Sequence, residues 1–333
     1  MNRFFKIAVV YIAQSIFMTS TVLALDNHQR PDYHAPIGVM RDHVHDKGDI
    51  MFSYRYSLMK MQGLRQGTDK ISTNAASATT NYMMLPLQMD MHMHMLGVMY
   101  GVTDNLTLSA MGSVIEKRMD NIKKMNGSQQ FREASGVGDT KINALYQFYE
   151  TDNSRLQFNL GLSLPGGEIK EAYNNTRLPY AMQPGSGSYE LLPGLSFSSY
   201  NGNDSYGGQI NTVFRLNSNN SGYKLGDMYN ATIWGAKKLG EAFSLSSRLN
   251  YTISEAIEGN DKTLMPNMTP ANNIAAYGGK RLDFFLGGNF IAPKGYFKGH
   301  RLAIEFGFPI YQKTDALQLE TDYQLIIGWQ KAF

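Results

Sequence analysis

Apolar and polar residues alternate with a period of two over much of this chain. In the segment SRLQFNLGLSLP, residues 154–165, the Leu and Phe side chains at even positions share one face, and Gln157, Asn159 and Ser163 lie on the other. The segments AFSLSSRLNYTIS (242–254) and HRLAIEFGFPIYQ (300–312) repeat the pattern. Successive side chains of a β-strand point to opposite faces, so the pattern predicts strands with one apolar face. Their lengths suit strands that cross a bilayer.

Twelve strands are predicted in this way. Their approximate spans are 50–61, 86–101, 105–118, 138–149, 154–165, 188–199, 204–216, 227–239, 242–255, 279–291, 300–311 and 318–333. The connections are tight at 102–104, 150–153, 201–203 and 240–241, and long and polar at 62–85, 119–137, 166–187 and 256–278. Short turns at one end and long loops at the other are typical of outer-membrane barrels. The prediction is an all-β fold, a transmembrane antiparallel β-barrel of about 12 strands in meander order.

Two alternatives stay open at this point. A soluble β-sandwich also alternates, although it would not usually require so many long segments with Tyr or Phe near their ends. A count of ten or fourteen strands would also fit, because the span 86–101 is rich in Met and the span 300–311 contains Pro309.

The beginning of the chain has the pattern of a signal peptide. Arg3 and Lys6 precede an apolar run over 7–17, and Val22 and Ala24 stand where a signal peptidase cleaves. The run is shorter than the roughly 20 residues of a membrane-spanning helix. We therefore expect residues 1–24 to be removed and the mature chain to begin at about Leu25.

The end of the chain points to the same compartment. In DYQLIIGWQKAF, apolar side chains from Tyr323 to Phe333 share one face, and the last residue is Phe. This resembles the terminal strand by which the barrel-assembly machinery recognises its substrates. Lys331 departs from the pattern, and we expect it to snorkel to the rim of the membrane. The expected location is the outer membrane of a Gram-negative bacterium.

Composition agrees with an exported barrel. The mean hydropathy of −0.32 is that of a soluble protein. A transmembrane barrel reconciles this value with an export signal, because half of each strand faces a polar lumen. There is no Cys, which excludes thiol chemistry and thiolate metal sites. The net charge of +3 and the lack of a basic stripe give no indication of a nucleic-acid partner.

The polar faces of the predicted strands supply candidate lumen residues. They are Arg55, Asp90, His92, His94, Lys141, Glu190, Arg215, Arg248, Arg281, Asp283 and Glu305. Opposite charges among them can bind a solute, or can pair across the bore and brace it. Residues 25–49, which contain Pro31 and Pro36, are expected to form a periplasmic lead-in or a plug inside the barrel of residues 50–333.

Methionine and histidine suggest metal chemistry. In LQMDMHMHMLGVMYG, Met89, Met91, Met93 and Met95 share one face, with the two histidines on the other. Thioethers suit Cu(I), whereas imidazole and carboxylate suit Zn(II), Cu(II) or Ni(II). The candidate metal ligands are His43, His45, His92, His94, Met59 and Met61. The competing interpretation is that Met fills space, with the Met89–Met95 face against lipid and His92 and His94 in the lumen.

Nothing in the sequence favours an enzyme. The barrel histidines His92, His94 and His300 have no Ser two positions away, as a hydrolase with His and Ser on one strand would need. We therefore expect no catalytic residue and no cofactor, with a bound metal as the one alternative.

Three segments resemble a known family. They are DHVHDKGDIMFSYRYSLMKMQGLRQGT, MDMHMHMLGVMYGVTDNLTLSAM and SGVGDTKINALYQFY. They are similar to the outer-membrane transporters grouped under the name of the meta-pathway of phenol degradation. The resemblance implies transport of small aromatic or hydrophobic solutes across the lipid of the outer membrane. Two further hypotheses remain, a copper-type metal-binding or efflux barrel and a closed structural barrel.

Overall fold

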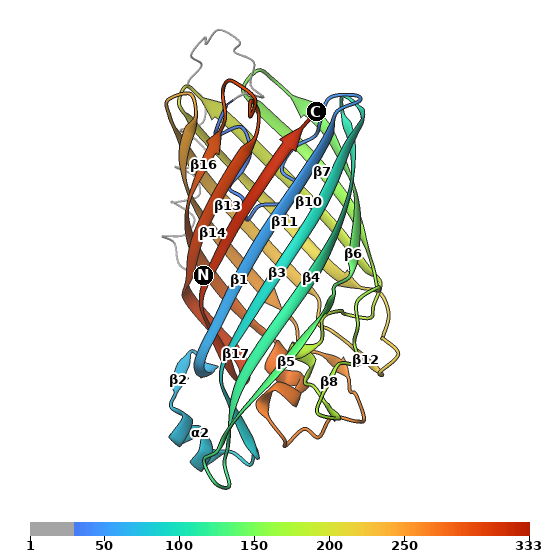
Figure 1. Cartoon of the computed structure of the whole chain (residues 1–333), viewed down its shortest axis with the longest axis vertical. Coiled ribbons are helices and arrows are strands. Elements are labelled where there is room, and N and C mark those ends of the chain that lie inside the picture. Colours follow the sequence, from blue (N-terminus) through green and yellow to red (C-terminus); the bar gives the residue numbers. More distant parts are fainter. Residues whose placement is uncertain (1–29) are drawn as a thin grey trace, which may run out of the picture.

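The computed structural model describes residues 30–333, and the predicted signal peptide lies outside this range. Eleven strands of the described chain form a closed ring (Figure 1). They are β1 (Ile50–Gly67), β3 (Met84–Thr103), β4 (Leu106–Lys123), β6 (Thr140–Glu150), β7 (Ser154–Leu164), β10 (Glu190–Asn201), β11 (Asp204–Arg215), β13 (Met228–Leu239), β14 (Phe243–Ser254), β16 (Gly279–Ile291) and β17 (Arg301–Ala332). Each is antiparallel to its neighbours, and β17 closes the ring against β1.

The last strand crosses the barrel wall twice. Residues 301–314 of β17 pair with β16, and residues 314–332 pair with β1. A ring of antiparallel neighbours needs an even number of crossings. Within residues 30–333, the double crossing of β17 raises the number from eleven to twelve. The predicted antiparallel barrel of about 12 strands is confirmed.

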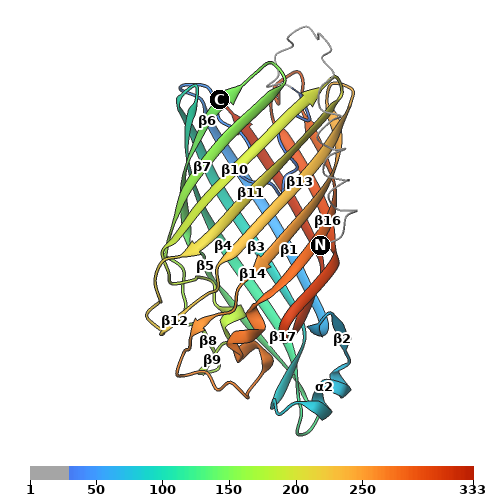
Figure 2. The same cartoon turned by 180° about the vertical axis from the view of Figure 1, so that it is seen from behind.

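The two ends of the barrel differ (Figures 1 and 2). At one end, which we call the short-turn end, two to three residues join β3 to β4, β7 to β6, and β10 to β11, and residues 292–300 lead into β17. At the other, the long-loop end, the connections carry short elements. These are β2 (Asp69–Ile71), α2 (Thr73–Thr79), β5 (Gln129–Val137), β8 (Ala172–Tyr173), β9 (Thr176–Arg177), η2 (Tyr180–Met182), β12 (Tyr223–Lys224), β15 (Glu258–Gly259), η3 (Pro270–Asn272) and η4 (Ile274–Tyr277).

Strand boundaries were predicted well at the short-turn end and less well at the long-loop end. The expected loops 62–85 and 119–137 include the ends of β1 and β4 and all of β5, which pairs with β4. Residues 279–291 form β16 as expected. Pro309, which has no N–H to donate, lies opposite Asp283 at a register shift in the β16–β17 pair.

The faces of the barrel are reversed relative to a soluble protein. Outward side chains such as Leu160, Ile210 and Leu245 are exposed, whereas Asn159, Gln209 and Ser244 point inward and are buried. An apolar outer band around a polar interior is the pattern of a transmembrane barrel, because lipid covers the apolar side chains. Among residues 30–333, no helix is both long and apolar enough to span a bilayer.

Candidate functional site

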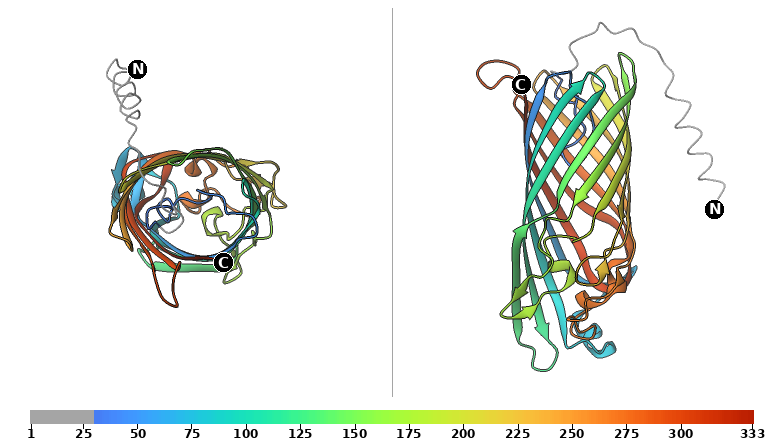
Figure 3. Two further views of the ribbon diagram at one scale, coloured as in Figure 1. Left: turned by 90° about the horizontal axis from the view of Figure 1, so that it is seen from above. Right: turned by 90° about the vertical axis from the view of Figure 1, so that its right-hand side faces the viewer.

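The N-terminal residues 30–49 lie inside the barrel, and we call them the lumen segment. Figure 3, in the view along the barrel axis, shows the start of the blue chain crossing the ring of strands. Side chains of the wall hold its backbone in place. Arg301 Nη2 donates to Ala35 O at 2.7 Å, Gln157 Nε2 donates to Arg41 O at 2.6 Å, and the His45 N–H donates to Thr107 Oγ1 at 2.8 Å. These bonds replace the solvation that the buried backbone loses.

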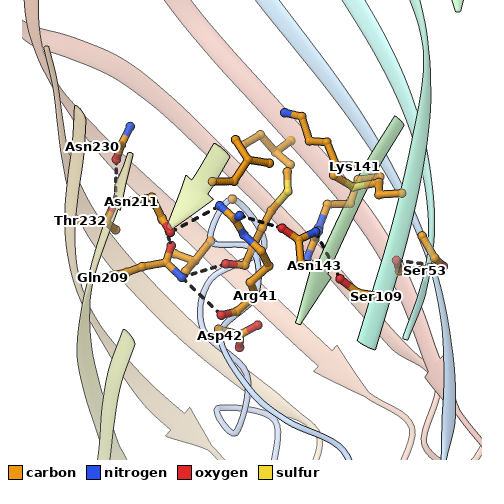
Figure 4. A pocket seen from close by; sticks show the side chains of 18 of the residues that line it. Arg41, Asp42, Ser53, Ser109, Lys141, Asn143, Gln209, Asn211, Asn230 and Thr232 are labelled. Carbon is orange, nitrogen blue, oxygen red and sulfur yellow. Dashed lines mark hydrogen bonds between the residues drawn. The ribbon is translucent and has the colours of Figure 1, made fainter. Parts of the chain in front are cut away.

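A cavity of about 370 Å³ lies beside the lumen segment, in the middle of the barrel. Arg41 projects into it from the lumen segment and donates to Asn143 at 3.0 Å (Figure 4). Amide side chains of β6, β11 and β13 line one part of its wall. Apolar side chains line another part, namely Met51, Met99, Met111, Leu192, Val213, Met228 and Ile326. The volume and the mixed lining are typical of a site for a small organic molecule.

Some charged side chains on the wall of this cavity have an ion-pair partner, and others do not. Arg248 contacts Glu305 at 2.9 Å, and Arg281 contacts Asp283 at 2.9 Å. By contrast, neither Arg55 nor Lys141 has a side-chain hydrogen bond or ion pair with any residue in the range 30–333. Burial lowers the pKa of Arg41 to about 10, which still leaves its guanidinium protonated at neutral pH. The cavity therefore presents three cations to a bound molecule.

At the long-loop end, apolar side chains of two loops pack against the inner wall. Met89 and Met119 on the wall contact Leu178 and Met182 of the connection between β7 and β10. The same cluster includes Ala271 of the connection between β14 and β16. Lys117 Nζ donates to the carbonyls of Ala181 and Gln183 and ties the first loop to β4. An Arg177–Asp261 ion pair of 2.8 Å joins the two loops to each other.

The expected orientation of β3 is wrong. Met95 lies opposite Arg55 in the β1–β3 pair, and both side chains are buried inside the barrel. Met89, Met91, Met93 and Met95 therefore face the lumen, next to Met59 and Met61 of β1. His92 and His94 lie on the outer face, where Tyr56 and Tyr54 hydrogen-bond their Nδ1 atoms at 2.8 Å. Polar residues are tolerated there near the long-loop end, where the wall leaves the apolar band.

The remaining predicted lumen residues face inward. These are Arg55, Lys141, Glu190, Arg215, Arg248, Arg281, Asp283 and Glu305. Asp90 does not, because it shares the outer face with His92 and contacts Lys60 at 3.6 Å. The candidate metal ligands do not form one site, since His43 and His45 lie in the lumen segment, Met59 and Met61 on the inner wall, and His92 and His94 outside.

The lumen segment instead gathers a cluster that sequence reasoning only partly identified. His34, Asp42 and His43 place one ligand atom each within 4.8 Å of one another. Burial, and then the charges of His43 and Arg301, lower the pKa of His34 well below its usual value. Burial alone would raise the pKa of Asp42, but the neighbouring His43 outweighs it and holds that pKa well below its usual value. His34 was missed because it lies nine positions before His43 in the sequence.

The overall structure is similar to solved outer-membrane barrels. No family model and no curated protein matches the sequence. An outer membrane channel from Pseudomonas putida F1 is similar with a TM-score of 0.63 and 14% identity, over 88% of this chain and 98% of that one. The toluene transporter TodX from P. putida has a TM-score of 0.43 and 10% identity, over 87% of this chain and 91% of that one. The fold is that of an outer-membrane β-barrel of Gram-negative bacteria.

Proposed function

We propose that this protein is an outer-membrane channel for small organic solutes with an aromatic or other apolar body and an anionic or strongly hydrogen-bond-accepting group. The observation that carries the proposal is the central cavity, where Arg41, Arg55 and Lys141 face a wall rich in methionine. A buried cation without a direct ion pair is costly, and an anionic solute group would remove part of that cost. Methionine adapts its shape, which suits a range of apolar bodies.

The path through the lumen has a constriction on either side of the cavity. The methionine cluster and its loops close the long-loop end, and the lumen segment closes the short-turn end. Following the usual orientation of such barrels, the long loops face the outside of the cell and the short turns face the periplasm. A solute entering from outside would displace loops, occupy the cavity and leave past the lumen segment. The lumen segment thus acts as a plug in this proposal.

The proposal agrees with one expectation from sequence and with one comparison of folds. The family of the meta-pathway of phenol degradation implies aromatic solutes, and the P. putida F1 barrel that this chain resembles in fold is a channel. Recognition of the C-terminal strand by the assembly machinery is part of the same proposal. It is supported by the outer-face position of Trp329, the exposure of Phe333, and the pairing of that strand with β1.

The test uses two aromatic ions whose charges are permanent, so that neither crosses lipid unaided. Benzenesulfonate and benzyltrimethylammonium uptake would be measured with the refolded mature protein in liposomes. We expect the anion to enter roughly tenfold faster or more, because a cationic lumen concentrates anions. The double variant Arg55→Gln/Lys141→Gln should lose most of that preference. Lys60→Gln, which removes a cation from the outer face, should keep it. Equal uptake of both ions by the wild type would refute the proposal.

The inward methionine face favours one other candidate, passage of a soft metal ion. Met59 and Met91 lie directly opposite each other in the β1–β3 pair, as do Met61 and Met89. Thioether pairs of this kind suit Cu(I). Uptake of Ag⁺, a redox-stable analogue, should then fall in Met59→Leu/Met91→Leu, a change that keeps side-chain volume. Unchanged Ag⁺ uptake in that variant would eliminate this candidate.

A further inference from the structure

Three histidines and one aspartate of the lumen segment meet near the short-turn end. The Nδ1 atoms of His34 and His43 are 3.3 Å apart, and His43 Nδ1 lies 2.9 Å from Asp42 Oδ1. On the other side of the same ring, His43 Nε2 lies 3.2 Å from His45 Nε2. The side chains of Asp42 and His43 are 5% and 2% exposed, so bulk water does not separate them.

The distances match those between the ligand atoms of a small metal ion. A tetrahedral ion with bonds of about 2.0–2.1 Å separates its ligand atoms by about 3.3 Å. The separations here are 3.3 Å between the two imidazole nitrogens and 2.9 Å and 4.0 Å from these nitrogens to the Asp42 carboxylate. We propose that His34, Asp42 and His43 bind a divalent transition-metal ion such as Zn²⁺ or Cu²⁺.

The proton positions favour an ion at this place. His43 Nδ1 faces both the carboxylate of Asp42 and the Nδ1 atom of His34. A proton on His43 Nδ1 can be donated fully to only one of these two partners. A further proton on His34 Nδ1 would point at the proton on His43 Nδ1. A metal ion that replaces this proton would satisfy all three groups at once. Imidazole and carboxylate ligands suit Zn²⁺, Cu²⁺ or Ni²⁺ rather than the soft ions that methionine prefers.

His45 would act on the metal through His43. With the metal on Nδ1, the Nε2–H of His43 can donate to Nε2 of His45 across the observed 3.2 Å. Such an outer hydrogen bond fixes the ring and its tautomer, as is usual for histidines that bind metals. His45 is therefore a positioning residue in this proposal.

A second cavity gives the ion a route and room for a water ligand. It has a volume of about 310 Å³, and its lining includes His34, His43, His45 and, from the strand end, Lys331. Ala292, Pro293, Lys298 and Gly299, which precede β17, form another part of the wall. Three protein ligands leave a fourth tetrahedral position open, which water commonly occupies. Asp42 and His43 also line the central cavity, so the proposed metal site lies between the two cavities, whereas His34 and His45 line only the second of them.

The experiment is a titration of the refolded, tag-free mature chain with Zn²⁺ and Cu²⁺ after treatment with a chelator. We expect one ion per chain, a loss of affinity of at least about 100-fold in His43→Ala, and a loss of roughly 10–100-fold in His45→Ala. The electron paramagnetic resonance spectrum of the bound Cu²⁺ should show hyperfine coupling to the nitrogens of two imidazoles. The matched control is His92→Ala/His94→Ala, which removes two histidines from the outer face and should bind as the wild type does.

Folding is checked separately from metal binding. The strands pair without the lumen segment, so each variant should retain the heat-dependent gel mobility of a closed barrel. The proposal is overturned if the wild type binds no stoichiometric ion, if His43→Ala binds equally well, or if the outer-face control loses the ion. None of these readouts depends on solute uptake, so a failure here leaves the channel proposal standing.

Discussion

At the scale of single residues, the Arg248–Glu305 ion pair on the inner wall holds the lumen segment through Glu305. Its side chains are 4% and 1% exposed, and Glu305 also accepts a hydrogen bond from the Gly38 N–H. Glu305→Gln would leave Arg248 buried without its counter-ion, and we expect a loss of about 3–5 kcal/mol in the free energy of unfolding. The free energy of unfolding would be measured by urea titration of the protein in detergent. Arg248→Met/Glu305→Leu should recover most of the loss, whereas Glu116→Gln on the exposed outer face should change little.

Charged residues were predicted better than methionines at this scale. Eight of the eleven predicted lumen residues point inward, because charge on a bilayer-facing strand is costly and alternation then fixes the face. For β3 this rule failed, because in MDMHMHM neither the methionine face nor the Asp/His face can be assigned to lipid or lumen from the sequence alone. Methionine is apolar enough for lipid and adaptable enough for a packed lumen. The loops that bury Met89 are about 90 residues away in sequence, as Met182 illustrates, and no local pattern reveals them.

At the scale of elements, one close approach governs the position of the lumen segment. A Cβ on Gly101 would lie 2.0 Å from Asp46 O and 2.7 Å from His45 O. Backbone cannot yield as a flexible side chain can, so Gly101→Ala should push the lumen segment away from β3. We expect faster tryptic cleavage after Arg41 in the refolded barrel. Gly112→Ala on β4, whose Cβ would meet nothing within 4 Å, is the control. Wild-type cleavage rates in Gly101→Ala would show that the segment is not held by this contact.

The elements of the wall were largely predictable, and the loops were not. Alternation located the crossings because each strand has one face in lipid, and tight turns marked the short-turn end. Beyond the membrane the lipid constraint ends, so β5 and the outer part of β4 carry little alternation to detect. The polar residues near Thr314 made it possible to predict that this part of the chain crosses the wall twice. They did not reveal that both crossings belong to one continuous strand, β17.

The two loops of the long-loop end depend on one carboxylate. Burial opposes ionisation of Asp261, but hydrogen bonds from Thr263 and Arg177 outweigh it and lower its pKa. Because the folded pKa is lowered, the contact is retained above the ordinary carboxyl range, near pH 4, and is lost as the pH falls through the lowered pKa. Burial raises the pKa of the neighbouring Tyr180, so its hydroxyl keeps its proton throughout this range.

Conductance should therefore rise in the wild type as the pH falls below about 4. Asp261→Asn should already conduct more at pH 7 and should lack most of that rise. Asp204→Asn, which removes an exposed carboxylate at the short-turn end, should follow the wild type. A wild-type response in Asp261→Asn would mean that another group closes the loops.

At the scale of the whole molecule, the two constrictions act in series, and this predicts how their removal combines. The resistances of the long-loop end and of the lumen segment add, so opening one end raises conductance only to the limit set by the other.

Deleting residues 30–45 removes the segment that Gln157 and Arg301 hold, and water can then solvate those side chains. We expect this deletion and Asp261→Asn each to give a modest increase in single-channel conductance. Together they should give more than the sum of the two increases. If the deletion alone reaches the value of the combination, the methionine cluster offers no barrier, and the lumen segment is the single gate of the channel.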